Sequence, residues 1–174
     1  MIFLKFLGKI LKVLRDGPSP AQVAGGFVLG MFLGLMPFFN LYSLLIILVI
    51  FILNVNISAA VLGIMVFKLF AYLLDPVFHE IGYALLVKAG LLHNFWTSLY
   101  NLPVFPLTKF NNTVVLGSFV SAIVFTIPVY FLSRTGVVQY RGKLEPAVKN
   151  MKIVKIVQGS KIYDIYSRVK NLGG

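Results

Sequence analysis

Four ionisable side chains lie in an otherwise apolar part of the sequence, and they have the most capacity for chemistry. They are Lys68, Asp75, His79 and Glu80. A charge at the centre of a bilayer costs ~2.5–3.5 kcal/mol on insertion scales, so such groups are paired, reach the surface or are functional. We favour a polar site for a lipid headgroup, an ion or a proton at His79 and Glu80. For Asp75 we favour a structural role in helix capping.

The segment His79-Glu80-Ile81-Gly82-Tyr83 begins like the zinc-binding pattern His-Glu-x-x-His, but its last position is tyrosine. Zinc then lacks its pair of histidines on one helix face, so we predict no metal site. The chain has no cysteine, which excludes thiolate chemistry and disulfides. Five acidic residues leave little material for general acid–base catalysis. We therefore expect no enzymatic activity and no cofactor.

Gly26, Gly30 and Gly34 recur at every fourth position of an apolar segment. A stripe of this kind lets another helix backbone approach closely where lipid supplies no hydrophobic driving force. Static helix packing is the interpretation we favour, and a gating or dimerising face is the alternative.

The elements that must position these residues are apolar helices. Hydrophobic residues make up 59% of the 174 residues and charged residues 12%, against ~45–50% and ~25% in soluble domains. From Gly17 to Phe67 there is no Asp, Glu, Lys, Arg or His. We therefore predict an all-α, polytopic integral membrane protein with short or broken helices.

The first apolar pair is too short for ordinary membrane crossings. Ser19 is a plausible N-cap with Pro20 as the first helical residue, and this helix should run to about residue 36. Pro37 breaks it before a second stretch, residues 41–53. A ~30 Å hydrocarbon core needs about 20 residues. The pair is therefore either two short spans or a re-entrant hairpin, and its shortness favours the hairpin.

Two further helices should follow the polar turn at residues 54–56. One covers residues 57–74, and the next, capped by Asp75 and begun by Pro76, covers residues 76–92. Trp96 and Tyr100 then lie in a segment typical of an aromatic belt. The last span should cover residues 114–132. Asn111-Asn112-Thr113 should cap its start, Pro128 should kink it, and Arg134 should mark its end.

Basic residues concentrate at both ends of the chain, whose net charge is +11. Residues 1–16 form an amphipathic helix with an apolar face for lipid and a basic face for anionic headgroups, made by Lys5, Lys9, Lys12 and Arg15. Residues 134–174 form a basic tail with amphipathic helices, and residues 17–133 form the membrane domain. Because basic flanks stay cytoplasmic, both termini should face the cytoplasm. Nucleic-acid binding is disfavoured because these residues flank apolar spans without a recognition motif.

The opening of this domain resembles a bacterial membrane-protein family. Ser19-Pro20-Ala21-Gln22-Val23-Ala24-Gly25-Gly26, followed by Leu29-Gly30-x-x-x-Gly34-x-x-Pro37, resembles the "domain of unknown function 2062" proteins. The block from Phe67 to Pro76 is similar to that family's second half, and the resemblance covers residues 1–135. It carries over no catalytic residues. It implies a bacterial inner-membrane protein with a role in envelope biogenesis.

Two functions follow from these features. The first is a non-enzymatic inner-membrane subunit that anchors or partners a larger envelope-biogenesis or lipid-transport protein. The second is a small transporter or lipid scramblase that uses the polar cluster, since broken helices with ionisable residues mark such sites.

Overall fold

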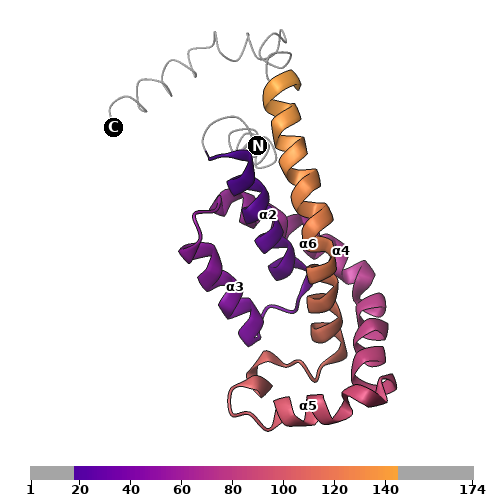
Figure 1. The fold of residues 1–174 in the computed structure, drawn as a ribbon. Coiled ribbons are helices and arrows are strands. Elements are labelled where there is room, and N and C mark those ends of the chain that lie inside the picture. The colour runs from indigo at the N-terminus through magenta and orange to yellow at the C-terminus, as the bar shows by residue number, and fades with distance from the viewer. Residues whose placement is uncertain (1–17, 145–174) are drawn as a thin grey trace.

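The computed structural model describes residues 18–144, and this part of the chain is helical with no strand. The predicted interfacial helix at residues 1–16 and residues 145–174 of the basic tail lie outside the described residues. Figure 1 shows four main apolar helices and a short helix, α5, that lies across one end of them. The prediction of an all-helical fold is confirmed for residues 18–144.

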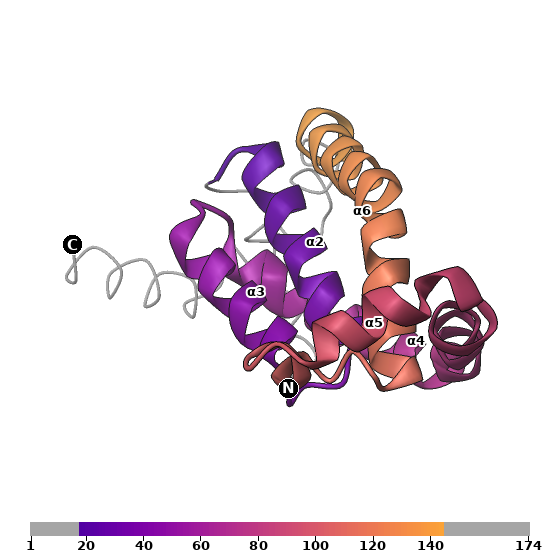
Figure 2. The same ribbon diagram turned by 60° about the horizontal axis from the view of Figure 1, so that its bottom comes forward.

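Local capping explains where the first two helices begin. Helix α2 spans Pro20–Leu35, and its N-cap Ser19 exchanges hydrogen bonds with Gln22 in a capping box. Helix α3 spans Leu41–Ile52, with the Asn40 side chain accepting a hydrogen bond from the Ser43 amide. Because Pro37 stands between them, the chain turns back and places α3 beside α2 (Figures 1 and 2).

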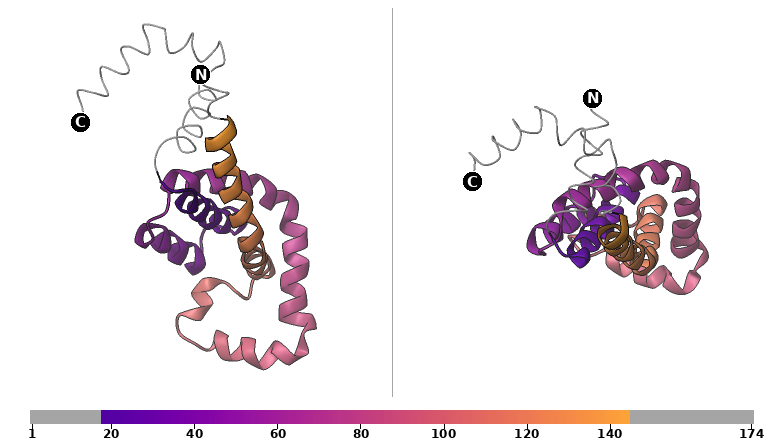
Figure 3. Two further views of the ribbon diagram at one scale, coloured as in Figure 1. Left: turned by 45° about the horizontal axis from the view of Figure 1, so that its top comes forward. Right: turned by 90° about the horizontal axis from the view of Figure 1, so that it is seen from above.

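The predicted helix break at Pro76 is wrong. Helix α4 runs without interruption over Ile57–Tyr83 with Pro76 inside it, and a π-helical turn, η1, continues it over Ala84–Lys88. Proline removes one backbone hydrogen bond and normally kinks a helix. The left view in Figure 3 shows a marked bend between the two halves of α4. Asp75 is therefore an interior residue of a bent helix and not an N-cap.

Three short elements connect α4 to the last helix. They are η2 at Gly90–Leu92, α5 at His93–Tyr100 and η3 at Phe105–Thr108. Helix α5 was not predicted. It runs across the ends of α4 and α6, as the lower part of Figure 1 shows.

Helix α6 spans Thr113–Gln139 and contains Pro128, and a second π-helical turn, η4, follows at Tyr140–Leu144. The Asn112 side chain caps it by accepting hydrogen bonds from the amides of Val114 and Val115. The predicted cap is thus confirmed, but the predicted close at Arg134 is wrong. The helix continues because Val137, one turn further on, is buried in a cluster with residues of α2 and α4.

The core lies where α2, α4 and α6 meet. Its largest cluster combines residues of all three helices, namely Val28, Met31, Leu35, Phe78 and Ala122. Phe78 lies just two residues beyond Pro76 and is 1% exposed. Packing on this side of the proline therefore holds the second half of α4 in place although a backbone hydrogen bond is lost.

Candidate functional site

The four predicted ionisable residues all lie on α4, but they make separate contacts. Lys68 lies in the first half, where its Nζ donates a hydrogen bond to the Met36 carbonyl oxygen at 3.4 Å and sits 5.9 Å from the Tyr72 ring centroid. Met36 is the C-cap of α2, where backbone carbonyls lack helical partners and the helix dipole favours a cation. Lys68 thus supplies a hydrogen-bond donor to a carbonyl group at the C-terminal end of α2.

The other three residues lie further along the helix. His79 Nδ1 and the Thr113 hydroxyl are 2.7 Å apart, which joins α4 to the start of α6. Glu80 lies 4.0 Å from Lys88 in an exposed ion pair. Asp75 is half-buried and has no hydrogen-bond or ion-pair partner within residues 18–144. The structure therefore does not bring the four predicted residues into one polar site.

The glycine stripe faces α4. A Cβ added to Gly26 would lie 2.3 Å from the Asn56 carbonyl oxygen, and one added to Gly30 would lie 2.1 Å from that of Ala60. Gly34 approaches Phe67 and Ile64 in the same way. Such distances are far below van der Waals contact, so only glycine permits this crossing of the two backbones.

A second glycine crossing, which the sequence reading did not single out, joins the far half of α4 to α6. A Cβ on Gly82 would lie 1.9 Å from the Thr113 carbonyl oxygen, and one on Gly117 would lie 1.8 Å from that of Phe78. Helix α4 is therefore held by close backbone contact at both of its halves, to α2 through one and to α6 through the other.

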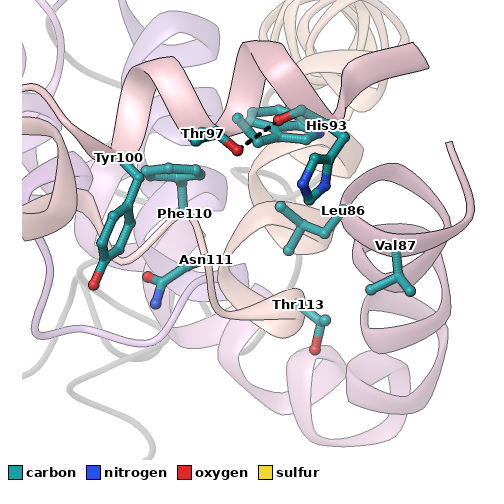
Figure 4. Close-up of a pocket in the computed structure, with 9 residues that line it drawn as sticks. Leu86, Val87, His93, Thr97, Tyr100, Phe110, Asn111 and Thr113 are labelled. Carbon is teal, nitrogen blue, oxygen red and sulfur yellow. Dashed lines mark hydrogen bonds between the residues drawn. The ribbon is translucent and has the colours of Figure 1, made fainter. Parts of the chain in front are cut away.

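An open pocket of about 310 Å³ lies beside this second crossing, at the end of the molecule that carries α5. Figure 4 shows the pocket between the last turn of α4, helix α5 and the chain leading into α6. Nine residues line it: Leu86, Val87, His93, Trp96, Thr97, Tyr100, Phe110, Asn111 and Thr113.

The π-helical turn fixes the aromatic wall of this pocket. In η1 the Ala89 amide bonds to the Ala84 carbonyl, one residue further back than in an α-helix. The Leu85 carbonyl, which an α-helix would pair with that amide, instead accepts a hydrogen bond from Trp96 Nε1 at 2.9 Å. This bond ties α5 to the end of α4.

Phe110 is the buried residue of this aromatic wall. It is 2% exposed, its ring stacks on Trp96 with centroids 5.7 Å apart, and Tyr100 meets its edge at 6.3 Å. Such pairs contribute ~0.5–1.5 kcal/mol each beyond their burial. The wall is thus a packed aromatic unit that gives the pocket a fixed shape.

Polar groups stand around this apolar wall. In Figure 4 the His93 imidazole points toward Leu86, while the Asn111 amide and the Tyr100 hydroxyl lie away from it. The Thr97 hydroxyl donates to the His93 carbonyl oxygen at 2.9 Å. Within the described part of the chain, no group of three His, Cys, Asp or Glu side chains could hold a metal ion. The pocket therefore offers hydrogen bonds and apolar contact to a ligand.

Sequence reasoning named Trp96 and Tyr100 only as residues of an aromatic belt and did not single out His93. Asn111 was named only as part of the predicted cap of the last span, and Phe110 was not singled out. The lining residues are spread over positions 86 to 113. They come together only when this segment folds, which local sequence patterns do not show.

Comparison with known proteins assigns the family. The family described as "Uncharacterized protein conserved in bacteria (DUF2062)" matches residues 4–145. The chain belongs to the DUF2062 family. The predicted resemblance is thereby confirmed, and the DUF2062 match includes every residue of the pocket.

One relative is similar over nearly its whole length. It is an "Uncharacterized protein" of Treponema pallidum (strain Nichols), 26% identical over 158 residues, which are 90% of this chain and 96% of the relative. No solved structure matches this DUF2062 chain significantly.

Proposed function

We propose that this protein is a non-enzymatic subunit of the bacterial inner membrane that anchors or partners a larger envelope-biogenesis or lipid-transport protein. The observation that carries the proposal is the outward exposure of its apolar side chains. Two helices, Ile57–Lys88 and Thr113–Gly142, are long and apolar enough to cross a membrane. Only 22% and 33% of their most apolar windows are buried, whereas a core helix of a soluble protein is mostly buried.

Lipid is the environment that suits this surface. Large apolar side chains such as Leu69, Leu73 and Ile127 are 68–77% exposed. Each such side chain left in water forgoes ~1.5–3 kcal/mol of burial free energy. A bilayer removes this cost for many side chains at once.

The hairpin of α2 and α3 supports a role as a binding subunit. Helix α3 has 12 residues, or about 18 Å at 1.5 Å per residue, which is short of a ~30 Å core. Only Ser43 and Ile50 of α3 are buried, and Leu44, Leu45 and Leu48 are exposed. In our proposal α3 enters the membrane without crossing it and presents this surface to a partner within the bilayer.

The transporter alternative receives less support from the geometry. A coupled site needs its ionisable groups within reach of one substrate. Lys68, His79 and Glu80 instead each contact a different partner.

The membrane placement is tested with single cysteines in a chain that has none of its own. Residue 91 follows the end of the candidate span Ile57–Lys88, residue 142 ends the span Thr113–Gly142, and residue 39, which is 87% exposed, lies in the α2–α3 turn. With a membrane-impermeant maleimide on intact spheroplasts, we expect labelling of Leu91→Cys and none of Gly142→Cys. For a re-entrant hairpin, Phe39→Cys is protected from outside. Labelling of Leu91→Cys and Gly142→Cys from the same side contradicts the proposal.

Partnership is tested by mild detergent extraction of a tagged chain. We expect a complex of fixed stoichiometry by native mass spectrometry, which is lost in Leu48→Ser on α3. Leu132→Ser on α6 is the matched control, because Leu132 is also an exposed leucine, and it should keep the complex. A chain that always purifies alone, or equal loss in both variants, contradicts the proposal.

A further inference from the structure

The aromatic pocket lies at the shared end of the two long apolar helices. Leu86 and Val87 belong to the last turn of the candidate span Ile57–Lys88, and Thr113 is the first residue of Thr113–Gly142. If these helices cross the membrane, the pocket lies where hydrocarbon meets the headgroups. This inference therefore rests on the membrane placement proposed above.

The lining combines apolar and polar groups at this boundary. Leu86, Val87 and the Phe110 ring offer apolar contact, while the His93 imidazole and Asn111 amide offer hydrogen bonds. Trp96 and Tyr100 are the residue types that prefer the interfacial level of a bilayer. A volume of about 310 Å³ is near the lower limit of small-molecule sites. It fits one polar headgroup with the start of an acyl chain, and its open side lets the chain leave into the membrane.

The charged residues next to the lining residues indicate which charge a bound headgroup should carry. Lys88 follows the lining residue Val87 in sequence, and Lys109 precedes the lining residue Phe110. Both side chains are exposed. The acidic residue near them is Glu80, whose 4.0 Å ion pair with Lys88 is exposed and therefore weak. The local balance is positive, which favours an anion.

We propose that this pocket binds an anionic phospholipid, with its headgroup at the polar groups of the lining, in the positive field of the neighbouring Lys88 and Lys109, and its first acyl carbons against the apolar lining residues.

The chain supplies its own probe for this site. Trp96 lines the pocket and is the single tryptophan among 174 residues, so tryptophan fluorescence, excited selectively over that of the eight tyrosines, reports on the pocket. The full chain is reconstituted into phosphatidylcholine vesicles that contain increasing fractions of brominated phosphatidylglycerol or brominated phosphatidylcholine. Bromine quenches only a tryptophan in contact with the lipid that carries it. We expect saturable quenching at a lower mole fraction for the anionic lipid than for the zwitterionic lipid.

Two neighbouring hydroxyl residues of α5 make a matched pair of variants. Thr97 and Ser98 are both exposed and both donate to the carbonyl four residues earlier, but only Thr97 lines the pocket. Thr97→Phe places a ring in the pocket and should abolish the preference for the anionic lipid. Ser98→Phe should retain it.

The lysines test the charge independently of pocket shape. Lys88→Gln and Lys109→Gln should each raise the half-quenching fraction of the anionic lipid by about fivefold, as expected for one basic residue at a membrane surface. Arg134→Gln removes an exposed charge from α6 away from the pocket and should leave the fraction unchanged.

Vesicle flotation of the same samples separates the two proposals. A protein that floats with the vesicles but is quenched equally by both lipids overturns the anionic-lipid pocket and leaves the membrane placement standing. Equal behaviour of Thr97→Phe and Ser98→Phe also overturns the pocket. A protein that does not float contradicts the membrane placement, and the pocket inference fails with it.

Discussion

At the scale of single residues, the glycines at the helix crossings are the positions that tolerate substitution least, because there is no room for a Cβ. Gly30 and Gly63 bring α2 and α4 together so closely that a Cβ on Gly63 would lie 2.4 Å from the Phe27 carbonyl oxygen. Carbonyl groups and glycine backbones are in direct contact here. The packing that soluble helices obtain from interdigitating side chains is supplied by backbone atoms.

Replacing Gly30 by alanine should separate these helices. Its Cβ would lie 2.1 Å from the Ala60 carbonyl oxygen, which belongs to rigid backbone, so we expect a destabilisation of at least ~1–3 kcal/mol. Thermal unfolding in detergent, followed by circular dichroism, measures it. Gly136→Ala is the control, since no atom lies within 4 Å of its Cβ and helix propensity favours alanine by ~1 kcal/mol. Equal stability of the two variants would refute the close crossing.

Lys68 permits a second test at this scale. Lys68→Met keeps the aliphatic chain but leaves the Met36 carbonyl without its side-chain donor, so we expect a loss of ~0.5–1.5 kcal/mol. Lys68→Arg keeps a donor and should restore most of the stability. If both variants unfold like the parent, Lys68 does not satisfy the end of α2.

At the scale of elements, α3 buries fewer residues than α2, α4 and α6, since only Ser43 and Ile50 of α3 are buried. Its ring contact with α6 is a parallel stack of Tyr42 on Phe119, with centroids 4.3 Å apart and planes at 9°. The buried Ser43 hydroxyl lies 3.3 Å from the Asn40 side chain at the start of α3. Helix α3 should therefore open more readily than α2, α4 and α6.

Removing this stack should loosen α3 selectively. Tyr42→Ala loses an aromatic pair worth ~0.5–1.5 kcal/mol, so hydrogen exchange of the α3 amides should accelerate roughly fivefold while α2 stays protected. Tyr72→Ala is the control because Tyr72 is 73% exposed and its ring contacts Lys68 of its own helix, so no ring contact between helices is lost. Unchanged exchange in Tyr42→Ala would show that other contacts hold α3.

Sequence reasoning succeeded where the cause is local to an element. The starts at Ser19 and Asn112 were predictable because a capping side chain bonds to amides two or three residues ahead. The break at Pro76 was predicted wrongly because the burial of Phe78 and the crossing at Gly82 depend on α2 and α6. Helix α5 was missed because it has eight residues and no side-chain cap, so its position depends on Trp96 and the π-helical turn.

At the scale of the whole molecule, the apolar surface surrounds a small interior. The buried core is concentrated where α2, α4 and α6 meet, and the outer faces of α4 and α6 carry leucine, isoleucine, valine and phenylalanine. Lys68 and His79 of α4 contact the ends of neighbouring helices, Glu80 pairs with Lys88, and Asp75 is half-buried. This distribution is the opposite of that in a soluble helical domain.

This surface should bind a belt of detergent after extraction. We expect size-exclusion chromatography with light scattering to give a bound detergent mass comparable to the 19.4 kDa of the chain, because lipid-facing side chains need an apolar cover. A soluble protein of the same mass is the control and should bind none. A monodisperse chain in detergent-free buffer would contradict a membrane-embedded surface.

The two glycine crossings also set an order for the assembly of the chain during synthesis. The crossing of α2 with α4 uses residues up to Lys68, all of which are translated before α6 begins at Thr113. The crossing of α4 with α6 needs Gly117, which leaves the ribosome later. Because N-terminal segments become available first at ~5–20 residues per second, the α2–α4 pair has several seconds to form before α6 arrives. We therefore expect α6 to assemble onto a pair that α2 and α4 form first.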